Sequence, residues 1–190
     1  ELFFRTYNWL MAEKSFQEIF HEVFIPLMQE LGMLWQTDTI SPAHEHFISF
    51  LIKQKLLIHT EQLQVLKPTK TDKVFVLSLP MNEIHELGLM YLNYEILSKG
   101  YKTIYLGESM PIENLKDLKK HFDSIVFVSY LTVQPDRESV NEYVSQMKHE
   151  LEDETTQLWY IGRMVEHIDP AVISKSMSVF YSIDTLVEAL

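Results

Sequence analysis

A change in hydrophobic pattern near residue 70 constrains the fold of this chain more than any other feature of the sequence. Before it, apolar residues recur with helical spacing; after it, short apolar runs alternate with helical segments to the end of the chain. Short apolar runs that alternate with helical segments indicate strands paired in parallel. Residues 73–190 are therefore expected to form an α/β domain with a doubly wound, five-stranded parallel sheet.

The same pattern predicts the individual elements of this domain. Strands are expected at 74–79, 103–106, 124–129, 158–161 and 178–181. Helices are expected at 84–98, 112–122, 137–150 and 170–174, with a final turn after Asp184. The charged segment 67–72, which contains a proline, is typical of a linker and is expected to precede the domain.

Residues 1–67 have helical periodicity and are expected to form a small helical bundle. A short helix is expected over 2–11, and a longer one carries an apolar stripe made of Phe16, Ile19, Phe20, Val23, Phe24, Leu27, Leu31 and Leu34. Pro26 lies inside that stripe and predicts a kink. Ser41 and Pro42 predict the start of the last helix, which runs to about residue 66. One face of that helix carries Phe47, Phe50, Leu51, Gln54 and Ile58.

The composition excludes several kinds of site. The absence of cysteine excludes disulfides, thiolate metal sites and cysteine nucleophiles. No apolar run is long enough to cross a membrane and the N-terminus lacks the order of a signal peptide, so a cytoplasmic protein is expected. The formal net charge of −11 repels phosphate backbones, so this chain alone is not expected to bind nucleic acid.

The chain also lacks the glycine-rich motifs that hold phosphates. Its five glycines form neither a GxGxxG nor a GxxxxGK[ST] pattern, and no Gly-x-Ser-x-Gly elbow is present. A dinucleotide site, a P-loop and a conventional hydrolase are therefore not supported. Any ligand of the α/β domain must be held in another way.

His85 lies where the first strand ends and the first helix begins, which is where open α/β sheets bind their ligands. Taken alone, it is either an ordinary loop residue or an exposed imidazole able to bind a metal carried by a cofactor. A ligating histidine needs a partner for its second ring nitrogen, and Glu83 is close enough in sequence to provide one. Gly88 lacks a side chain, so a bulky group could approach the first helical turn.

The segment Glu83-x-His85-x-x-Gly88 resembles the (Asp/Glu)-x-His-x-x-Gly signature of cobalamin-binding domains, whose fold is flavodoxin-like. In that family a Ser-x-Leu follows at a distance, and here Ser129-x-Leu131 follows Gly88 after forty residues. The resemblance implies that His85 replaces the cofactor's own dimethylbenzimidazole as the lower axial ligand of cobalt.

The resemblance also implies a slot for the displaced dimethylbenzimidazole tail. That slot would be lined by Ser129, Leu131 and Gly162. The family carries a Gly-Gly pair after the fourth strand, whereas this chain has Gly162-Arg163. The long cationic side chain of Arg163 would narrow the slot, point to solvent, or point to a phosphate.

Trp35, followed after nine residues by Glu45-His46, resembles the Trp-x9-Glu-His motif of light-sensing, cobalamin-dependent regulators of the MerR type. Taken singly, Trp35 could be a core residue, and the Glu45 carboxylate could lie in the first turn of its helix because the helix dipole stabilises a negative charge there. The family implies a helical bundle over the upper corrin face, with these three side chains around the adenosyl group. Its upper-ligand histidine is replaced here by Gln36, a poorer ligand for Co(III), and His44 is a nearby candidate.

The implied function is the C-terminal sensor of a MerR-type transcription factor rather than an enzyme. It would bind adenosylcobalamin, or else methylcobalamin, respond to light or to cobalamin itself, and self-associate as a homo-oligomer. A helix-turn-helix domain that contacts DNA would precede Glu1. Two alternatives stay open: a corrinoid carrier for methyl transfer, and a cobalamin-free protein-interaction module, which Gln36 and Arg163 would favour.

Overall fold

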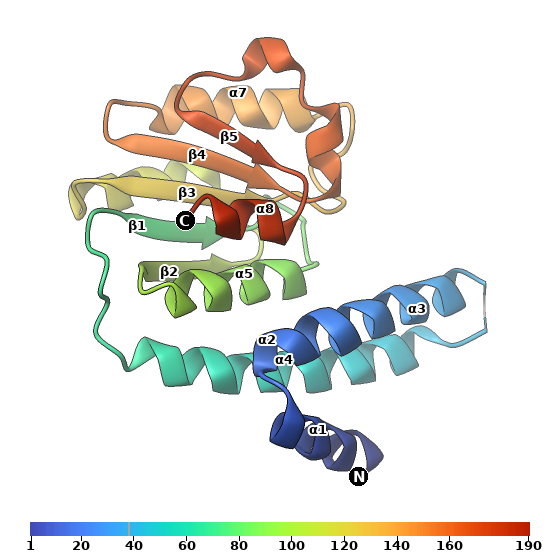
Figure 1. The fold of residues 1–190 in the computed structure, drawn as a ribbon. Helices are drawn as coiled ribbons and strands as arrows, with labels where there is room; N and C mark the ends of the chain where they lie inside the picture. Colours follow the sequence, from blue (N-terminus) through green and yellow to red (C-terminus); the bar gives the residue numbers. More distant parts are fainter. Residues whose placement is uncertain (38) are drawn as a thin grey trace. The chain divides into compact units, whose positions relative to one another are not determined.

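The computed structural model describes residues 1–37 and 39–190, without the side chain of Gln36. The chain divides into two compact units, Glu1–His59 and Thr60–Leu190. Figure 1 shows that helices form the first unit, whereas the second contains a sheet with helices. The division falls within a helix, ahead of the charged linker, and the expected domain bounds stay a prediction.

The first unit contains α1 (Leu2–Glu13), α2 (Phe16–Ile19), the π-helical turn η1 (Phe20–Phe24), α3 (Ile25–Gln36) and most of α4 (Pro42–Gln64). Aromatic rings form much of its interior, since Tyr7, Phe16 and Phe24 are buried. The rings of Tyr7 and Phe24 lie 6.1 Å apart in a stacked arrangement. The helical character expected for this part of the chain is therefore confirmed.

The kink expected at Pro26 is observed as a π-helical turn directly before it. The Ile25 N–H donates to the Phe20 carbonyl, five residues back, instead of the carbonyl four residues back. Pro26 then lies in the first turn of α3, where its missing N–H costs no helical hydrogen bond. The long helix expected from the apolar stripe is thus divided by a turn that accommodates the proline.

The apolar face expected on α4 is a true helix face, but it is largely exposed. Only Leu51 of that set is buried, whereas Phe47 is 62% exposed and Phe50 is 57% exposed. The buried row is instead Ile52, Leu56 and Thr60, spaced by four residues. The periodicity therefore identified a helix face correctly, but it does not identify what covers that face.

The second unit contains one parallel sheet. Its strands are β1 (Val74–Ser78), β2 (Lys102–Gly107), β3 (Ile125–Tyr130), β4 (Thr156–Ile161) and β5 (Met177–Phe180). All pairings are parallel, and the strand order is β2-β1-β3-β4-β5. The five strands and the doubly wound, flavodoxin-like α/β fold are confirmed. The order reverses between β1 and β3, so the ligand crevice of such a sheet lies at the carboxyl ends of these two strands.

The helices of this unit differ from expectation at their ends. They are α5 (Leu87–Ser98), α6 (Ile112–Leu115) with the 3-10 turn η2 (Lys116–Lys120), α7 (Val140–Leu151), η3 (Arg163–His167), η4 (Pro170–Val172) and α8 (Ile183–Glu188). The first helix was expected to start at residue 84, but residues 84–86 belong to the loop. The η3 turn was not expected.

Helices cover both faces of the sheet and enclose two cores. On one face, Leu77 and Val128 pack with residues of α5 and α8. On the other, Phe127 and Leu158 pack with residues of α6 and α7. In Figure 1 the labels α5 and α8 mark the first layer, and the label α7 marks the second. Among the helices that the structure describes, none combines the length and apolarity needed to cross a membrane.

Candidate functional site

Glu83 joins two loops at the carboxyl edge of the sheet. Its side chain is 1% exposed. One carboxylate oxygen accepts from the N–H groups of Ile84 and His85, each at 2.9 Å. The other accepts from the N–H groups of Val133 at 2.6 Å and Gln134 at 2.8 Å. The loop after β1 and the loop after β3 are therefore tied together through one buried carboxylate. The same bonds keep residues 84 and 85 out of α5.

The surroundings of Glu83 determine its charge. Burial alone would raise its pKa, but hydrogen bonds from the backbone N–H groups of Gln134, Val133 and His85, and from the His85 ring, lower the pKa to about 2. Hydrogen bonds to the ionised form favour that form. Glu83 is therefore an anion at neutral pH, in a position where a neutral acid would leave several N–H groups poorly paired.

This anion fixes the tautomer of His85. The His85 Nδ1 lies 2.6 Å from Glu83 Oε1, and an ionised carboxylate only accepts, so Nδ1 carries the proton and donates. The Nε2 atom then keeps its lone pair. The His85 side chain is 53% exposed, so this nitrogen can reach a group that approaches from outside. This is the arrangement found around metal-ligating histidines.

His85 does not belong to a protein metal cluster. Among the described residues, no group of three or more His, Cys, Asp or Glu side chains could hold an ion. A single imidazole suits a metal that arrives with most of its ligands already in place. The site therefore fits a cofactor-borne metal better than a free cation.

Gly88 lies in the first turn of α5, and its missing side chain is needed. A Cβ at this position would lie 2.6 Å from Cζ of Tyr130. The bulky group that approaches this turn is therefore a tyrosine ring of the protein itself. Tyr130 is the middle residue of the Ser-x-Leu motif, a position that the motif leaves open, so sequence reasoning did not single it out.

Ser129 and Leu131 lie on the other side of β3. Both are fully buried, and Ser129 Oγ lies 2.9 Å from the hydroxyl of Tyr143 in α7. Leu131 packs in the core beneath α6 and α7. The structure thus separates these two side chains from Gly88, which lies on the α5 side.

Gly162 packs directly against the backbone of Leu131. Its φ is +114°, and a Cβ there would lie 2.4 Å from the Leu131 carbonyl oxygen. Two backbone bonds hold the contact: Leu131 N–H to the Ile161 carbonyl at 2.7 Å, and Met164 N–H to the Leu131 carbonyl at 2.9 Å. Two of the three expected slot residues therefore meet. Arg163 is exposed.

Tyr160 is a polar residue at this site that the sequence did not single out. It pairs with Ser129 across β3 and β4, and its buried hydroxyl has no hydrogen-bond partner among the described residues. Burial raises the pKa of the neighbouring Tyr143 to about 12, and its bond to Ser129 opposes that rise. A tyrosine inside an apolar strand gives no signal by which sequence alone could assign it a polar role.

The first unit holds the other expected site residues around the α3–α4 connection. Trp35 lies in the last turn of α3 and is 49% exposed. Glu45 accepts from the Ser49 hydroxyl, and its other oxygen lies 3.7 Å from Nδ1 of His46. The structure thus brings Glu45 and His46 together. The Gln36 side chain lies outside the described residues.

His44 makes a local contact within the first turn of α4. Its Nδ1 lies 3.0 Å from the hydroxyl of Ser41. The residue is exposed, and no contact of its other ring nitrogen is found among residues 1–37 and 39–190. Its role as an upper ligand stays a prediction.

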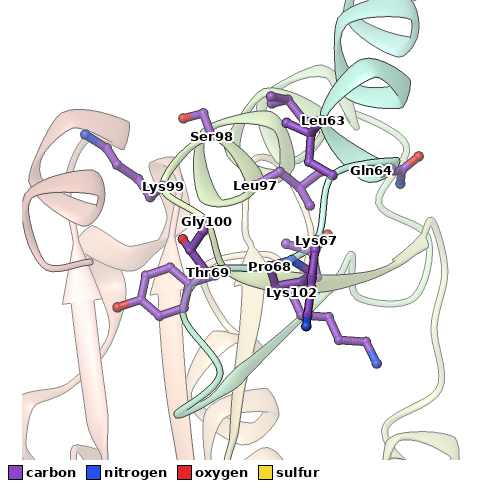
Figure 2. Close-up of a pocket in the computed structure, with 13 residues that line it drawn as sticks. Leu63, Gln64, Lys67, Pro68, Thr69, Leu97, Ser98, Lys99, Gly100 and Lys102 are labelled. Atoms are coloured by element: carbon purple, nitrogen blue, oxygen red, sulfur yellow. The ribbon is translucent and has the colours of Figure 1, made fainter.

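A cavity of about 540 Å³ lies at the opposite edge of the sheet. It is lined by the end of α4, the segment after it, the end of α5 and the start of β2. Figure 2 shows Leu63 and Leu97 on one wall, with Lys67 and Lys102 near Pro68. Because β2 begins here and ends at Gly107, this cavity is remote from the carboxyl edge that carries His85.

Comparisons with known sequences relate the chain to cobalamin proteins and to transcriptional repressors. Residues 5–58 match the family described as "B12 binding domain". The HTH-type transcriptional repressor CarH of Myxococcus xanthus is 26% identical over 141 residues, which cover 73% of this chain and 42% of CarH. The repressor CarA of the same organism is 29% identical over 92 residues, covering 48% of this chain and 29% of CarA. The chain thus spans less than half the length of these relatives.

A comparison with solved structures supports the fold. The monomethylamine corrinoid protein of Methanosarcina barkeri superposes with a TM-score of 0.74 over 95% of this chain and 87% of that protein, at 12% sequence identity. At that identity the likeness concerns the fold alone. Together with the sequence matches, it confirms that the chain resembles the cobalamin-binding part of MerR-type regulators.

Proposed function

We propose that this chain is the cobalamin-binding sensor of an HTH-type transcriptional regulator, with His85 as the lower axial ligand of the cobalt. The observation that carries this proposal is the Glu83–His85 pair. A buried anion holds Nδ1 of the imidazole, and Nε2 is left with its lone pair on a half-exposed side chain. The pair lies at the switch point of a flavodoxin-like sheet.

The residues present fit a corrinoid. A corrinoid would bring most of the ligands of its cobalt with it, so the protein would need to supply only one nitrogen. His85 can supply it, and Glu83 can hold the imidazole ring in one orientation through Nδ1. When bound, an alkylcobalamin supplies a light-sensitive cobalt–carbon bond.

The first unit supplies the residues proposed for the upper side of the cofactor. Trp35, Glu45 and His46 flank one connection, and Phe47 and Phe50 extend an exposed apolar face along α4. Apolar surface of this kind is expected where an adenosyl group is to be covered. The proposal therefore favours adenosylcobalamin over methylcobalamin.

The proposed regulation is a population shift. A ligand moves an equilibrium only if it binds one arrangement better than another, so the bound cofactor must prefer one arrangement of the two units. Loss of the adenosyl group in light would remove that preference and change self-association. DNA contact would be made by a separate domain of the full-length regulator, as the resemblance to HTH-type repressors suggests.

The test is an absorbance titration of the purified protein with adenosylcobalamin, in the dark and after green light. His85→Ala is expected to weaken binding at least about tenfold and to shift the spectrum, since it removes the axial nitrogen. His149→Ala is the matched control, because that side chain is 82% exposed and lies on α7. A corrin spectrum that is lost from wild-type protein on gel filtration, or that is the same in both variants, contradicts the proposal.

The second candidate is a corrinoid carrier for methyl transfer. The fold shared with the monomethylamine corrinoid protein favours it. A carrier must expose the upper face to a methyltransferase, so it would bind methylcobalamin at least as tightly as adenosylcobalamin. If neither form of cobalamin binds, the result supports the third alternative, a cobalamin-free protein-interaction module.

A further inference from the structure

Tyr130 fills the space beside Gly88. Three atoms at the tip of its ring, Cζ, Oη and Cε2, lie between 2.6 and 2.9 Å from the position that a Cβ of Gly88 would occupy. A real Cβ atom is not found that close to another heavy atom, so the ring leaves no room for a side chain at position 88. The Tyr130 ring therefore lies directly against the α5 backbone. The strand end and the first turn of α5 are therefore closed against each other by one aromatic side chain.

The alternation of side chains along β3 places this ring on the same side of the sheet as α5, the helix that follows His85. Ser129 and Leu131 face α7, and both are fully buried. Tyr130 points the other way, toward the core formed with α5 and α8. The α7 side of this strand end is thus packed shut by apolar contacts and the Ser129–Tyr143 bond. On the α5 side, the closing group is a side chain that can rotate.

We propose that Tyr130 is the residue that discriminates between complete and tail-less corrinoids, because its ring occupies the space beside Gly88 that a nucleotide tail would need. This inference rests on the proposed function. A corrinoid bound through His85 has its lower face toward the β1–α5 loop, and a tail on that face must enter the protein next to the histidine. Gly88 is three residues further along the chain and has no side chain, so the entry path is beside it once the ring moves.

Packing, rather than a hydrogen bond, holds the Tyr130 ring beside Gly88 in the part of the chain that the structure describes. The Tyr130 hydroxyl makes no hydrogen bond within the part of the chain that the structure describes, whereas the Tyr143 hydroxyl is paired with Ser129. Burial raises the pKa of Tyr130. Rotation of the ring therefore costs packing against the α5 core but breaks no hydrogen bond to the described residues. Rotation about the side-chain torsions also leaves the backbone ladder between β3 and β4 intact.

The test compares two matched ligands, adenosylcobalamin and adenosylcobinamide, which lacks the nucleotide tail. Their affinities are measured by absorbance titration for wild type, Tyr130→Ala and Tyr130→Phe. Tyr130→Ala is expected to bind adenosylcobalamin about tenfold more tightly, because the fraction of protein with an open path rises. Its affinity for adenosylcobinamide is expected to stay within about twofold of wild type on the same reasoning. Tyr130→Phe keeps the ring and is expected to behave as wild type.

Two further variants keep the result interpretable. Tyr181→Ala removes a tyrosine that is 74% exposed in the same unit and is expected to change neither affinity. Tyr130→Leu keeps apolar volume with a shorter reach, and replaces the alanine variant if that one does not fold. Equal changes for both ligands, or no change for either, overturn the role of Tyr130 while the proposed function stands. Failure of every variant, and of wild type, to bind either corrinoid overturns both.

Discussion

At the scale of single residues, Glu83 explains most of what is unusual about the candidate site. A carboxylate that is 1% exposed is costly to bury unless its charge is matched by donors. Here the donors come from two loops, so the charge that orients His85 also fixes the loop after β3. One residue therefore couples the structure of the sheet edge to the chemistry of the imidazole.

Glu83→Gln is expected to destabilise the protein by about 2–3 kcal/mol at pH 7, since an amide cannot accept hydrogen bonds at both positions.

The lowered pKa of Glu83 also predicts that the stability of the wild-type protein depends on pH. Because the pKa falls from 4.5 to about 2 on folding, Glu83 contributes about 3 kcal/mol that is fully present above pH 4.5 and lost as the pH falls toward 2. Denaturant unfolding of both proteins at pH 7 and near pH 2 measures the difference.

The control for this prediction is Glu154→Gln, at an exposed carboxylate of the same unit. It is expected to change the free energy of unfolding by less than about 0.5 kcal/mol at either pH. If the gap between wild type and Glu83→Gln stays constant across that pH range, the carboxylate is not the ionised acceptor described here.

At the scale of elements, the candidate site depends on close backbone packing between the ends of β3 and β4. The connection from β4 to η3 passes so close to the end of β3 that only glycine fits at position 162. Gly162→Ala is expected to destabilise the protein by at least about 2 kcal/mol, since the φ of +114° is strained for alanine and the new Cβ meets a carbonyl oxygen. Thermal or denaturant unfolding measures this change.

The matched control is Gly32→Ala. Gly32 lies inside α3, and a Cβ there would have no neighbour within 4 Å. Alanine has the better helix propensity, so this variant is expected to gain roughly 0.5–1 kcal/mol. Equal effects of the two substitutions would contradict the close approach at Gly162.

The elements also show how far the sequence could predict this structure. The five strands were predictable because buried parallel strands form short apolar runs between turns. The start of α5 was not, because Glu83 holds residues 84 and 85 in the loop through contacts that include a distant segment. His85, Glu83 and Gly88 followed from spacing. Tyr130 and Tyr160 did not, because an aromatic residue in a strand looks the same whether it fills a core or a ligand path.

At the scale of the whole molecule, the two units carry different parts of the proposed site. His85 and its partner belong to the unit Thr60–Leu190, whereas Trp35, Glu45 and His46 belong to the unit Glu1–His59. The family match at residues 5–58 lies entirely within the first unit. Binding that depends on residues of both units is therefore the property that distinguishes a sensor from a carrier.

Trp35→Ala tests that dependence. Trp35 is 49% exposed, so its loss is expected to leave the free energy of unfolding nearly unchanged. Its affinity for adenosylcobalamin is expected to fall about tenfold, because burying an aromatic side chain against an adenosyl group contributes about 1.5 kcal/mol or more. Its affinity for methylcobalamin is expected to change little, since a methyl group offers little surface. Trp9→Ala, at a residue of α1 that is 67% exposed, is the control and should alter neither affinity. Equal losses for both ligands, or a loss confined to methylcobalamin, would instead favour the carrier.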